Sequence, residues 1–206
     1  MTQPLHFSTP DESEELARAE VYGLLSQLFY AAPGQDLYEQ LKVAPTVAPS
    51  PGAFLESSWT ELVAATRRLT REQVAEEYDA LFMGIGKPEI FLYGSHHLAG
   101  ALNEKPLVAL RDSLRQLGLA RAETMAETED HIACLCEVMR YLIAGDDVGV
   151  SNLAVQQRFF NGHLRGWASG LFEQIAAHPQ ADFYRSLAVF ARDFFAVEAQ
   201  GFDMME

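Results

Sequence analysis

The stretch Glu127-Thr128-Glu129-Asp130-His131-Ile132-Ala133 precedes Leu135, Met139 and Leu142, whose spacing is typical of the buried face of a helix. The pattern predicts a helix over 128–144. Thr128 or Glu127 would cap its first amides, and the acidic side chains suit the positive end of the helix dipole. Neighbours on a helix point about 100° apart, so Asp130 and His131 cannot both serve the cap. One of them is therefore free for another partner.

Helical periodicity recurs along the whole chain, and strand alternation does not. We expect an all-α, single-domain helical bundle over 1–206, with about nine to ten helices. The predicted helices are 11–29, 36–43, 59–69, 71–82, 106–117, 128–144, 152–160, 164–177 and 182–199. Thr70 is the expected cap of the fourth, and Gly118 is expected to end the fifth.

Three segments between these helices are expected to be irregular. Residues 1–10 are expected to be flexible, and 44–52, with three prolines, is expected to be a loop. Residues 83–100, with four glycines and a proline, predict a long connector that holds a binding groove. This connector is also a possible hinge, so the protein is expected to be a monomer or a dimer that exchanges segments.

The composition of the chain restricts the kinds of molecule that it can bind. The 206 residues are 49% hydrophobic, which is enough for one core. With 15 basic and 29 acidic residues the net charge is −14, which argues against nucleic acid and favours a cationic peptide. No basic leader and no run approaching the ~20 apolar residues of a membrane helix is seen. We therefore expect a cytoplasmic protein that is not an integral membrane protein.

Residues that suggest metal, nucleotide or disulfide chemistry have simpler explanations. Cys134 and Cys136 are two apart on one helix, so a disulfide is not expected, and with His131 they make a poor metal set. Gly84 and Gly86 lack the third glycine of a dinucleotide loop and follow a helix, not a strand. No metal or cofactor is expected.

Several short motifs in order carry a family resemblance. They are Tyr78-x-x-Leu81-Phe82-x-Gly84-x-Gly86, Ser95, Gly118-Leu119, the Glu-x-Glu-Asp-His-Ile-Ala stretch at 127–133, Phe160, His163-Leu164, Trp167 and Phe183-Tyr184. Over residues 77–195 the chain resembles the TorD/DmsD/NarJ family of redox-enzyme maturation chaperones. It departs from the family at Thr128, where a proline is common, and at His96, where an aromatic residue is frequent. These departures concern the shape of the pocket and hence the choice of client.

The resemblance implies a non-catalytic, cytoplasmic chaperone of the all-helical TorD-like fold. Such a protein binds the twin-arginine signal peptide, or the apo form, of a molybdenum or tungsten oxidoreductase and delays export until cofactor insertion. A formate dehydrogenase-like client is favoured, with trimethylamine N-oxide, dimethyl sulfoxide and nitrate reductases as alternatives. The family's Asp-His pair, matched by Asp130 and His131, implies a peptide-binding surface there. Tyr78, Ser95 and Glu127 match positions near the same groove.

A twin-arginine peptide needs carboxylates within bidentate reach and an apolar surface beside them. We expect Asp130 to be the principal anionic contact, with Glu127 and Glu129 in support. Alternatively, Asp130 fixes the loop that contacts the client. His131 would orient that carboxylate or donate to a peptide carbonyl, and its titration would tune release.

Aromatic residues are the candidates for the apolar surface. Tyr78, Phe91, Tyr93 and Trp167 are expected to supply it, although Leu81 and Phe82, next to Tyr78, are expected to be core. His163 precedes Trp167 by four residues, so the two would share one side of a helix, either lining the groove or packing inside.

Two alternative functions belong to other classes. One is a nucleotide-binding regulator, because guanine-nucleotide binding has been suggested for this family, but no Walker-type loop is present. The other is a hydrolase in which Asp130 and His131 act as an acid-base pair with Ser95 as nucleophile. His97 stands where the Gly-x-Ser-x-Gly elbow needs a glycine, which argues against this reading.

Overall fold

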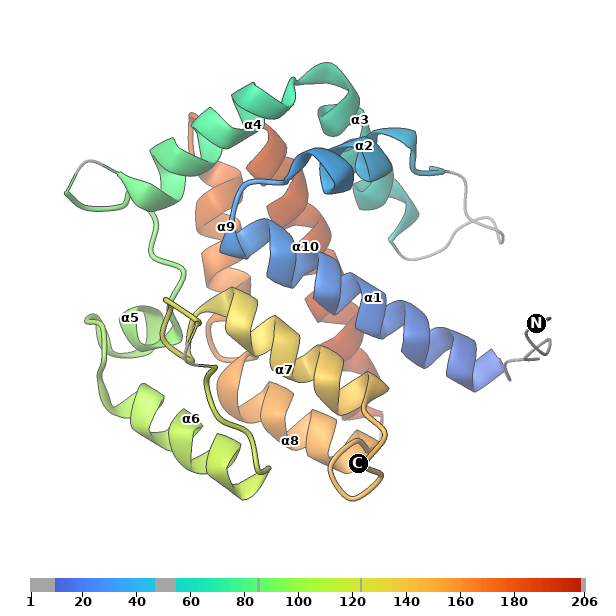
Figure 1. The fold of residues 1–206 in the computed structure, drawn as a ribbon, viewed down its shortest axis with the longest axis vertical. Helices are drawn as coiled ribbons and strands as arrows, with labels where there is room; N and C mark the ends of the chain where they lie inside the picture. Colours follow the sequence, from blue (N-terminus) through green and yellow to red (C-terminus); the bar gives the residue numbers. More distant parts are fainter. Residues whose placement is uncertain (1–9, 47–54, 85, 123, 205–206) are drawn as a thin grey trace.

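The computed structural model describes residues 10–46, 55–84, 86–122 and 124–204 (Figure 1). The helices are α1 (Pro10–Tyr30), α2 (Gln35–Val43), α3 (Glu56–Arg68), α4 (Arg71–Tyr78), the π-helix η1 (Asp79–Met83), α5 (Gly94–Ala99), α6 (Lys105–Gln116), α7 (Ile132–Ala144), α8 (Leu153–His163), α9 (Ala168–Ala177) and α10 (Phe183–Asp203). Within these ranges no strand forms, so the all-α prediction is confirmed. Residues 1–9, predicted to be flexible, and 47–52 of the predicted loop lie outside the described residues.

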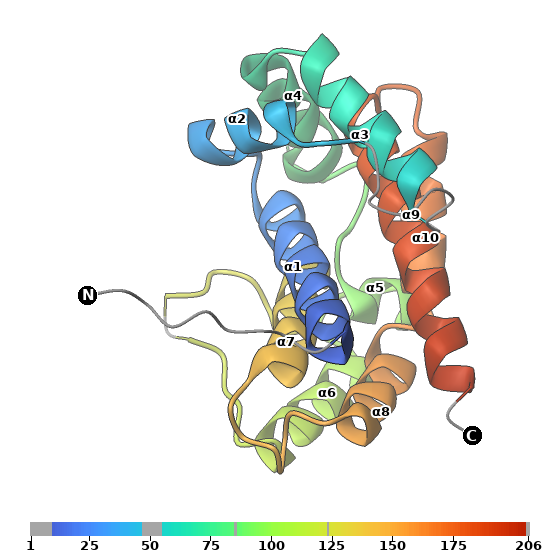
Figure 2. The ribbon, with the colours of Figure 1, turned by 90° about the vertical axis from the view of Figure 1, so that its right-hand side faces the viewer.

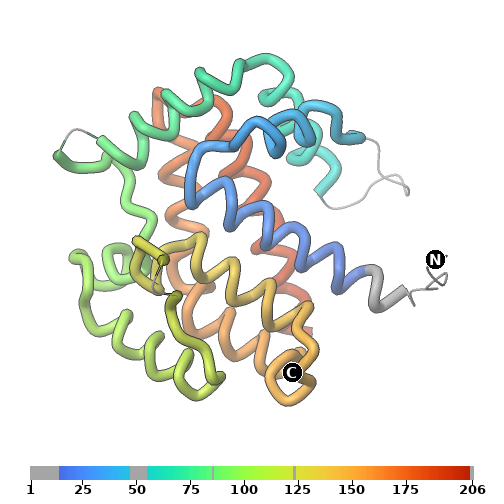
Figure 3. Tube along the Cα trace, in the orientation of Figure 1, coloured from blue at the N-terminus to red at the C-terminus, as the bar shows by residue number. Residues whose placement is uncertain are grey.

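Two long helices, α1 and α10, organise the bundle. Helix α1 packs along α7, and α10 packs along α9 and α3. Figure 2 shows α10 running along one side of the molecule, and the trace in Figure 3 shows α1 and α7 side by side. The connection after α4 leads to α5 and α6, which lie at the opposite end of the molecule from α2 and α3 (Figure 1). No described helix is long and apolar enough to cross a membrane.

Aromatic side chains fill the space between these helices. Tyr22 of α1 meets Phe194 of α10 edge to face, with ring centroids 4.9 Å apart, and Phe195 meets Phe172 of α9 at 5.1 Å. Leu81 and Phe82 are buried, as predicted. Burial of large side chains dominates the stability of a domain of this size.

The helix ends show which local signals decided the boundaries. Thr70 accepts a hydrogen bond from the Gln73 amide and forms a capping box, so the predicted cap is confirmed. Gly118 follows α6 with φ of +70°, as a helix-terminating glycine should. Gly84 ends η1 with φ of +59°, and a Cβ there would lie 2.1 Å from the Lys87 carbonyl oxygen. Glu77 caps a distant helix, because its carboxylate accepts from three amides at the start of α10.

Three predicted boundaries are wrong. Helix α7 begins at Ile132, four residues after the predicted start at Thr128, and its N-cap is His131. Helix α9 begins at Ala168, not Leu164, so His163 and Trp167 do not share one helix. The connector, predicted to be irregular, contains the six-residue helix α5.

Candidate functional site

The connector and the segment before α7 pair as two short extended strips. The Gly94 amide donates to the Asp130 carbonyl at 2.9 Å, and the Ile132 amide donates to the Leu92 carbonyl at 2.8 Å. Tyr93 and His131 form the isolated bridge between them. These backbone bonds hold two segments, about 38 residues apart in sequence, in one fixed arrangement. We call this pairing the 93–131 clip.

The side chain of Asp130 adds two hydrogen bonds to the clip. Its Oδ2 accepts from the Ser95 amide at 2.8 Å, and its Oδ1 accepts from the Thr128 hydroxyl at 2.7 Å. Asp130 is 3% exposed and Ser95 is fully buried. The Ser95 hydroxyl in turn accepts from the Asn103 amide at 3.2 Å. The carboxylate therefore joins α5 to the start of α7, as in the second of the two roles considered above.

His131 is buried and serves as the N-cap of α7. Its Nδ1 accepts from the Ala133 amide at 3.2 Å, which requires an unprotonated Nδ1. Its ring meets Tyr93 edge to face at 5.0 Å. Burial lowers the pKa of His131 to about 4, although Glu127 and Asp130 act in the opposite direction. The ring is therefore neutral at pH 7.

The lowered pKa of His131 predicts that the stability of the folded protein depends on pH. The unfolded chain protonates His131 near pH 6.5 but the folded protein only near pH 4, so stability falls as the pH is lowered through this window. We expect a loss of about 3 kcal/mol from this residue. Asparagine is also a good N-cap, so His131→Asn should keep the helix start and flatten the dependence. Urea unfolding at several pH values measures the free energy of unfolding of both proteins. If this free energy depends on pH equally in the wild type and in His131→Asn, His131 is not the residue responsible.

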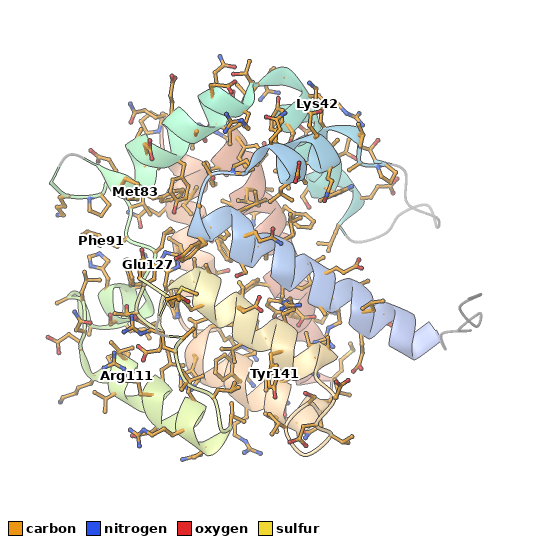
Figure 4. The ribbon with its side chains drawn as sticks, in the orientation of Figure 1. Lys42, Met83, Phe91, Arg111, Glu127 and Tyr141 are labelled. Atoms are coloured by element: carbon orange, nitrogen blue, oxygen red, sulfur yellow. The ribbon has the colours of Figure 1, made fainter. Side chains whose placement is uncertain are left out.

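Glu127 is the half-buried carboxylate at the edge of the clip. It accepts a hydrogen bond from the Tyr93 hydroxyl. Burial and this carboxylate raise the pKa of Tyr93, so the phenol stays a donor. Among the described residues Glu127 has no ion pair, and its oxygens have capacity for further donors. Figure 4 shows Glu127 and Phe91 on the same side of the molecule.

Glu129, one residue before Asp130, is already paired. Arg111 of α6 binds it through both Nε and Nη2, at distances of 2.9 to 3.1 Å. Burial opposes ionisation of Glu129, but the bond from Arg111, a backbone hydrogen bond and the charges of Arg111 and Arg121 together lower the pKa of Glu129. This bidentate pair shows how a guanidinium fits the carboxylates of this segment.

Ring systems from the connector line the same region. Phe91 stacks on His96 with centroids 4.2 Å apart, and His97 stacks on Trp167 at 5.2 Å. The Lys87 ammonium lies 5.6 Å from the centre of the Phe91 ring. His97 Nε2 donates to the Phe91 carbonyl at 2.7 Å, and burial lowers its pKa. Phe91 and His96 are half-buried, with one face of each ring packed against the other ring.

The remaining candidates lie beneath this surface. The Trp167 indole donates to the His163 carbonyl at 2.7 Å, and the His163 ring contacts the Ser113 hydroxyl at 2.9 Å. Both residues line a cavity of about 70 Å³ together with Ser95 and Asp130. Tyr78 is buried, with its hydroxyl donating to the Tyr30 carbonyl at 2.7 Å. It belongs to the aromatic core.

The structure thus brings together most of the residues that the sequence nominates. Tyr93, Ser95, Glu127, Asp130 and His131 form one cluster, with Trp167 and His163 behind it. Sequence reasoning missed the contacts of Asn103 and Arg111, because their partners are brought near only by folding. It also missed the local bond from Thr128 to Asp130, because Thr128 was interpreted as a cap of the helix. Within the described part of the chain no group of three or more His, Cys, Asp or Glu is arranged to hold a metal ion.

The Glu127 carboxylate is half-buried at the edge of the clip, and the buried Ser95 is not placed to attack a substrate. The described residues define an all-helical protein. The chain belongs to the TorD/DmsD/NarJ family of redox-enzyme maturation chaperones, because residues 51–173, more than half of it, match the family profile described as nitrate reductase delta subunit.

Similar proteins with curated names support this family assignment. The chain is similar to the "Probable Tat proofreading chaperone DmsD" of Haemophilus influenzae, with 25% identity over 84% of this chain and 86% of the relative. It is also similar to the "Chaperone protein TorD" of Colwellia psychrerythraea, with 23% identity over 91% and 92%. The protein of the same name from Vibrio cholerae is 27% identical over 86% and 88%. The expected kind of protein, a chaperone for redox enzymes, is therefore confirmed.

Proposed function

We propose that this protein is a cytoplasmic chaperone that binds the twin-arginine signal peptide of a molybdenum or tungsten oxidoreductase. The observation that carries the proposal is the Glu127 carboxylate, held at the rim of the clip by Tyr93 and without an ion pair in the described structure. A net charge of −14 favours encounter with a cationic peptide. The name of the DmsD relative, a Tat proofreading chaperone, supports the same class of client.

In this proposal a peptide guanidinium binds Glu127 in bidentate fashion and lies against the faces of Phe91 and Tyr93. The pair between Arg111 and Glu129, two residues from Glu127, supports this geometry, and the Lys87 ammonium, 5.6 Å from the centre of the Phe91 ring, occupies a position that a peptide cation would take. Arginine is favoured over lysine because only the planar guanidinium group can donate to both carboxylate oxygens and also stack on an aromatic ring.

The buried residues hold this surface in place. Asp130 and Ser95 fix the connector against α7, and His131 caps α7 and supports the Tyr93 ring. Trp167 and His163 pack behind the connector, where a Cβ on Gly94 would lie 3.1 Å from the Trp167 ring. A preorganised surface of this kind binds without a large ordering cost.

The client and the timing belong to the same proposal. The chaperone would retain the apo-catalytic subunit until its cofactor is inserted, and only then release it for export. A formate dehydrogenase-like enzyme is the favoured client, followed by trimethylamine N-oxide, dimethyl sulfoxide and nitrate reductases.

Calorimetric titration with a synthetic twin-arginine signal peptide tests the proposal. We expect binding that weakens at least about ten-fold when both arginines are replaced by lysine, because lysine cannot form the bidentate contact. The matched lysine peptide has the same charge and length, so it separates recognition from general electrostatic attraction. Equal affinities for the two peptides, or no binding of peptides from several molybdoenzyme classes, would contradict it.

A further inference from the structure

The side chain of Lys87 reaches the aromatic ring of Phe91, four residues later in the chain. Its ammonium lies over the ring, 5.6 Å from the ring centre. Lys87 is exposed, and among the described residues it makes no ion pair. The negative face of an aromatic ring attracts an ammonium in this position. The contact therefore places a positive charge of the protein itself next to the 93–131 clip.

The backbone fixes the position of Lys87, whereas its side chain is free to rotate. A Cβ on Gly84 would lie 2.1 Å from the Lys87 carbonyl oxygen, so the backbone of Lys87 packs directly against Gly84. Ile90 is 1% exposed, and its amide donates to the Leu81 carbonyl at 3.0 Å. Lysine has a flexible four-carbon stem. The ammonium can therefore leave the ring while the backbone stays in place.

Only one face of the Phe91 ring is left for a cation. The His96 ring stacks on the other face, with centroids 4.2 Å apart and 27° between the ring planes. A peptide guanidinium that stacks on Phe91 needs the remaining face, and so does an ammonium over the ring. Two cations at such short range also repel each other. Lys87 and an arginine of the client therefore exclude each other at this ring.

We infer that Lys87 is an internal competitor, whose ammonium the client's arginine must displace from Phe91 in order to bind. This inference rests on the proposed function and adds a control of affinity to the same site. The apparent affinity for the client is reduced by the fraction of the protein in which the ring is free. For an exposed contact between an ammonium and a ring, this reduction is about two- to six-fold.

The competition has a consequence for release of the client. When the peptide arginine leaves Phe91, the Lys87 ammonium returns to the ring and must be displaced again before the client can rebind. Lys87 therefore favours short occupation of the site over long occupation. A chaperone that hands its client on to export needs this behaviour.

Two variants of Lys87 with opposite expected effects test the inference by calorimetry with the twin-arginine peptide. Lys87→Gln removes the ammonium, so we expect binding to tighten about two- to six-fold. Lys87→Arg keeps the charge and puts a guanidinium, which stacks on aromatic rings more readily, over Phe91. We expect this variant to bind the peptide more weakly than the wild type does. Circular dichroism verifies the fold of each variant.

Lys42 provides the matched control. Its ammonium lies 5.7 Å from the centre of the Tyr38 ring, also four residues away, on α2. Figure 4 shows Lys42 on a different part of the molecule from Phe91 and Glu127. Lys42→Gln removes the same charge and the same kind of contact, so it measures the general electrostatic effect alone. We expect it to bind the peptide as the wild type does, because salt screens distant surface charges.

Nuclear magnetic resonance of ¹³C-labelled lysine reports the displacement itself. The ring current of an aromatic side chain moves the ε-methylene protons of a lysine above it upfield. We expect the peptide to return the Lys87 signal, assigned from Lys87→Gln, to the position of an unstacked lysine. The Lys42 signal should not move, because Lys42 stays over Tyr38. A Lys87 signal that is unchanged at saturating peptide would overturn the inference.

The affinities separate the inference from the proposed function. If the wild type binds the peptide but Lys87→Gln binds it no more tightly than Lys42→Gln does, Lys87 is not a competitor and the proposed function stands. Tighter binding by Lys87→Arg than by the wild type would also refute the inference alone. If neither the wild type nor Lys87→Gln binds the peptide, the proposed function fails and the inference fails with it.

Discussion

Replacing Glu198 with alanine is expected to lower the free energy of unfolding by about 3 to 5 kcal/mol. The Glu198 carboxylate accepts from Arg18 at 2.7 and 2.8 Å and from the Tyr22 hydroxyl at 3.1 Å. Its side chain is 4% exposed and that of Arg18 is 17% exposed. The truncated protein would keep a guanidinium and a phenol in the interior without their acceptor, which is more costly than the loss of the attraction itself.

Urea unfolding of matched variants measures this effect. Asp112→Ala breaks an exposed ion pair with Arg115, whose side chains are 52% and 71% exposed, and is expected to cost no more than about 1 kcal/mol. The double change Arg18→Met with Glu198→Leu should recover much of the loss, because no charge is then left unpaired. If Glu198→Ala costs no more than Asp112→Ala, this ion pair does not join α1 to α10 as the structure indicates.

Replacing Asp130 with alanine is expected to weaken twin-arginine peptide binding roughly ten-fold or more. The change leaves the buried Ser95 amide without its acceptor, at a cost of about 1 to 3 kcal/mol, and frees the connector from α7. Asp130→Asn is expected to retain most of the affinity. Its amide oxygen can accept from Ser95, and its NH₂ group can donate to the Thr128 hydroxyl.

This pair of variants separates the two roles of Asp130. A residue that holds the clip tolerates asparagine, whereas a direct partner of an arginine does not, because the charge is lost in both variants. Calorimetry supplies the affinities, and hydrogen exchange over 92–103 reports whether the connector has opened. Equal loss of affinity in both variants, with unchanged exchange, would assign Asp130 to direct contact.

The helices themselves were predictable because apolar spacing marks them along the chain. Thr70 and Gly118 are local signals that act within one turn, and both proved right. The short α5 escaped prediction because six residues are too few to show a period. The cap that Glu77 provides for α10 was also missed, since its partners lie more than 100 residues away.

The start of α7 shows why the site was only partly predictable. Acidic residues before an apolar run are the usual signature of a helix N-terminus, and Glu127 to Asp130 carry that signature. In the structure Asp130 bonds the Ser95 amide instead, and His131 takes the cap. The structure places Tyr93, Ser95, Glu127, Asp130 and His131 close together, but which of them are buried depends on a pairing with the connector that no local pattern encodes.

A double-mutant cycle between Glu127 and the peptide arginines tests the central claim most directly. One change is Glu127→Gln, and the other replaces each arginine in turn with citrulline, which has nearly the same shape without the charge. Calorimetry on the four combinations gives the coupling free energy for each arginine. We predict a coupling of about 1.5 kcal/mol or more for at least one of them, as for close charge pairs in other interfaces. Additivity within about 0.5 kcal/mol for both arginines would contradict the claim that Glu127 binds the twin-arginine motif.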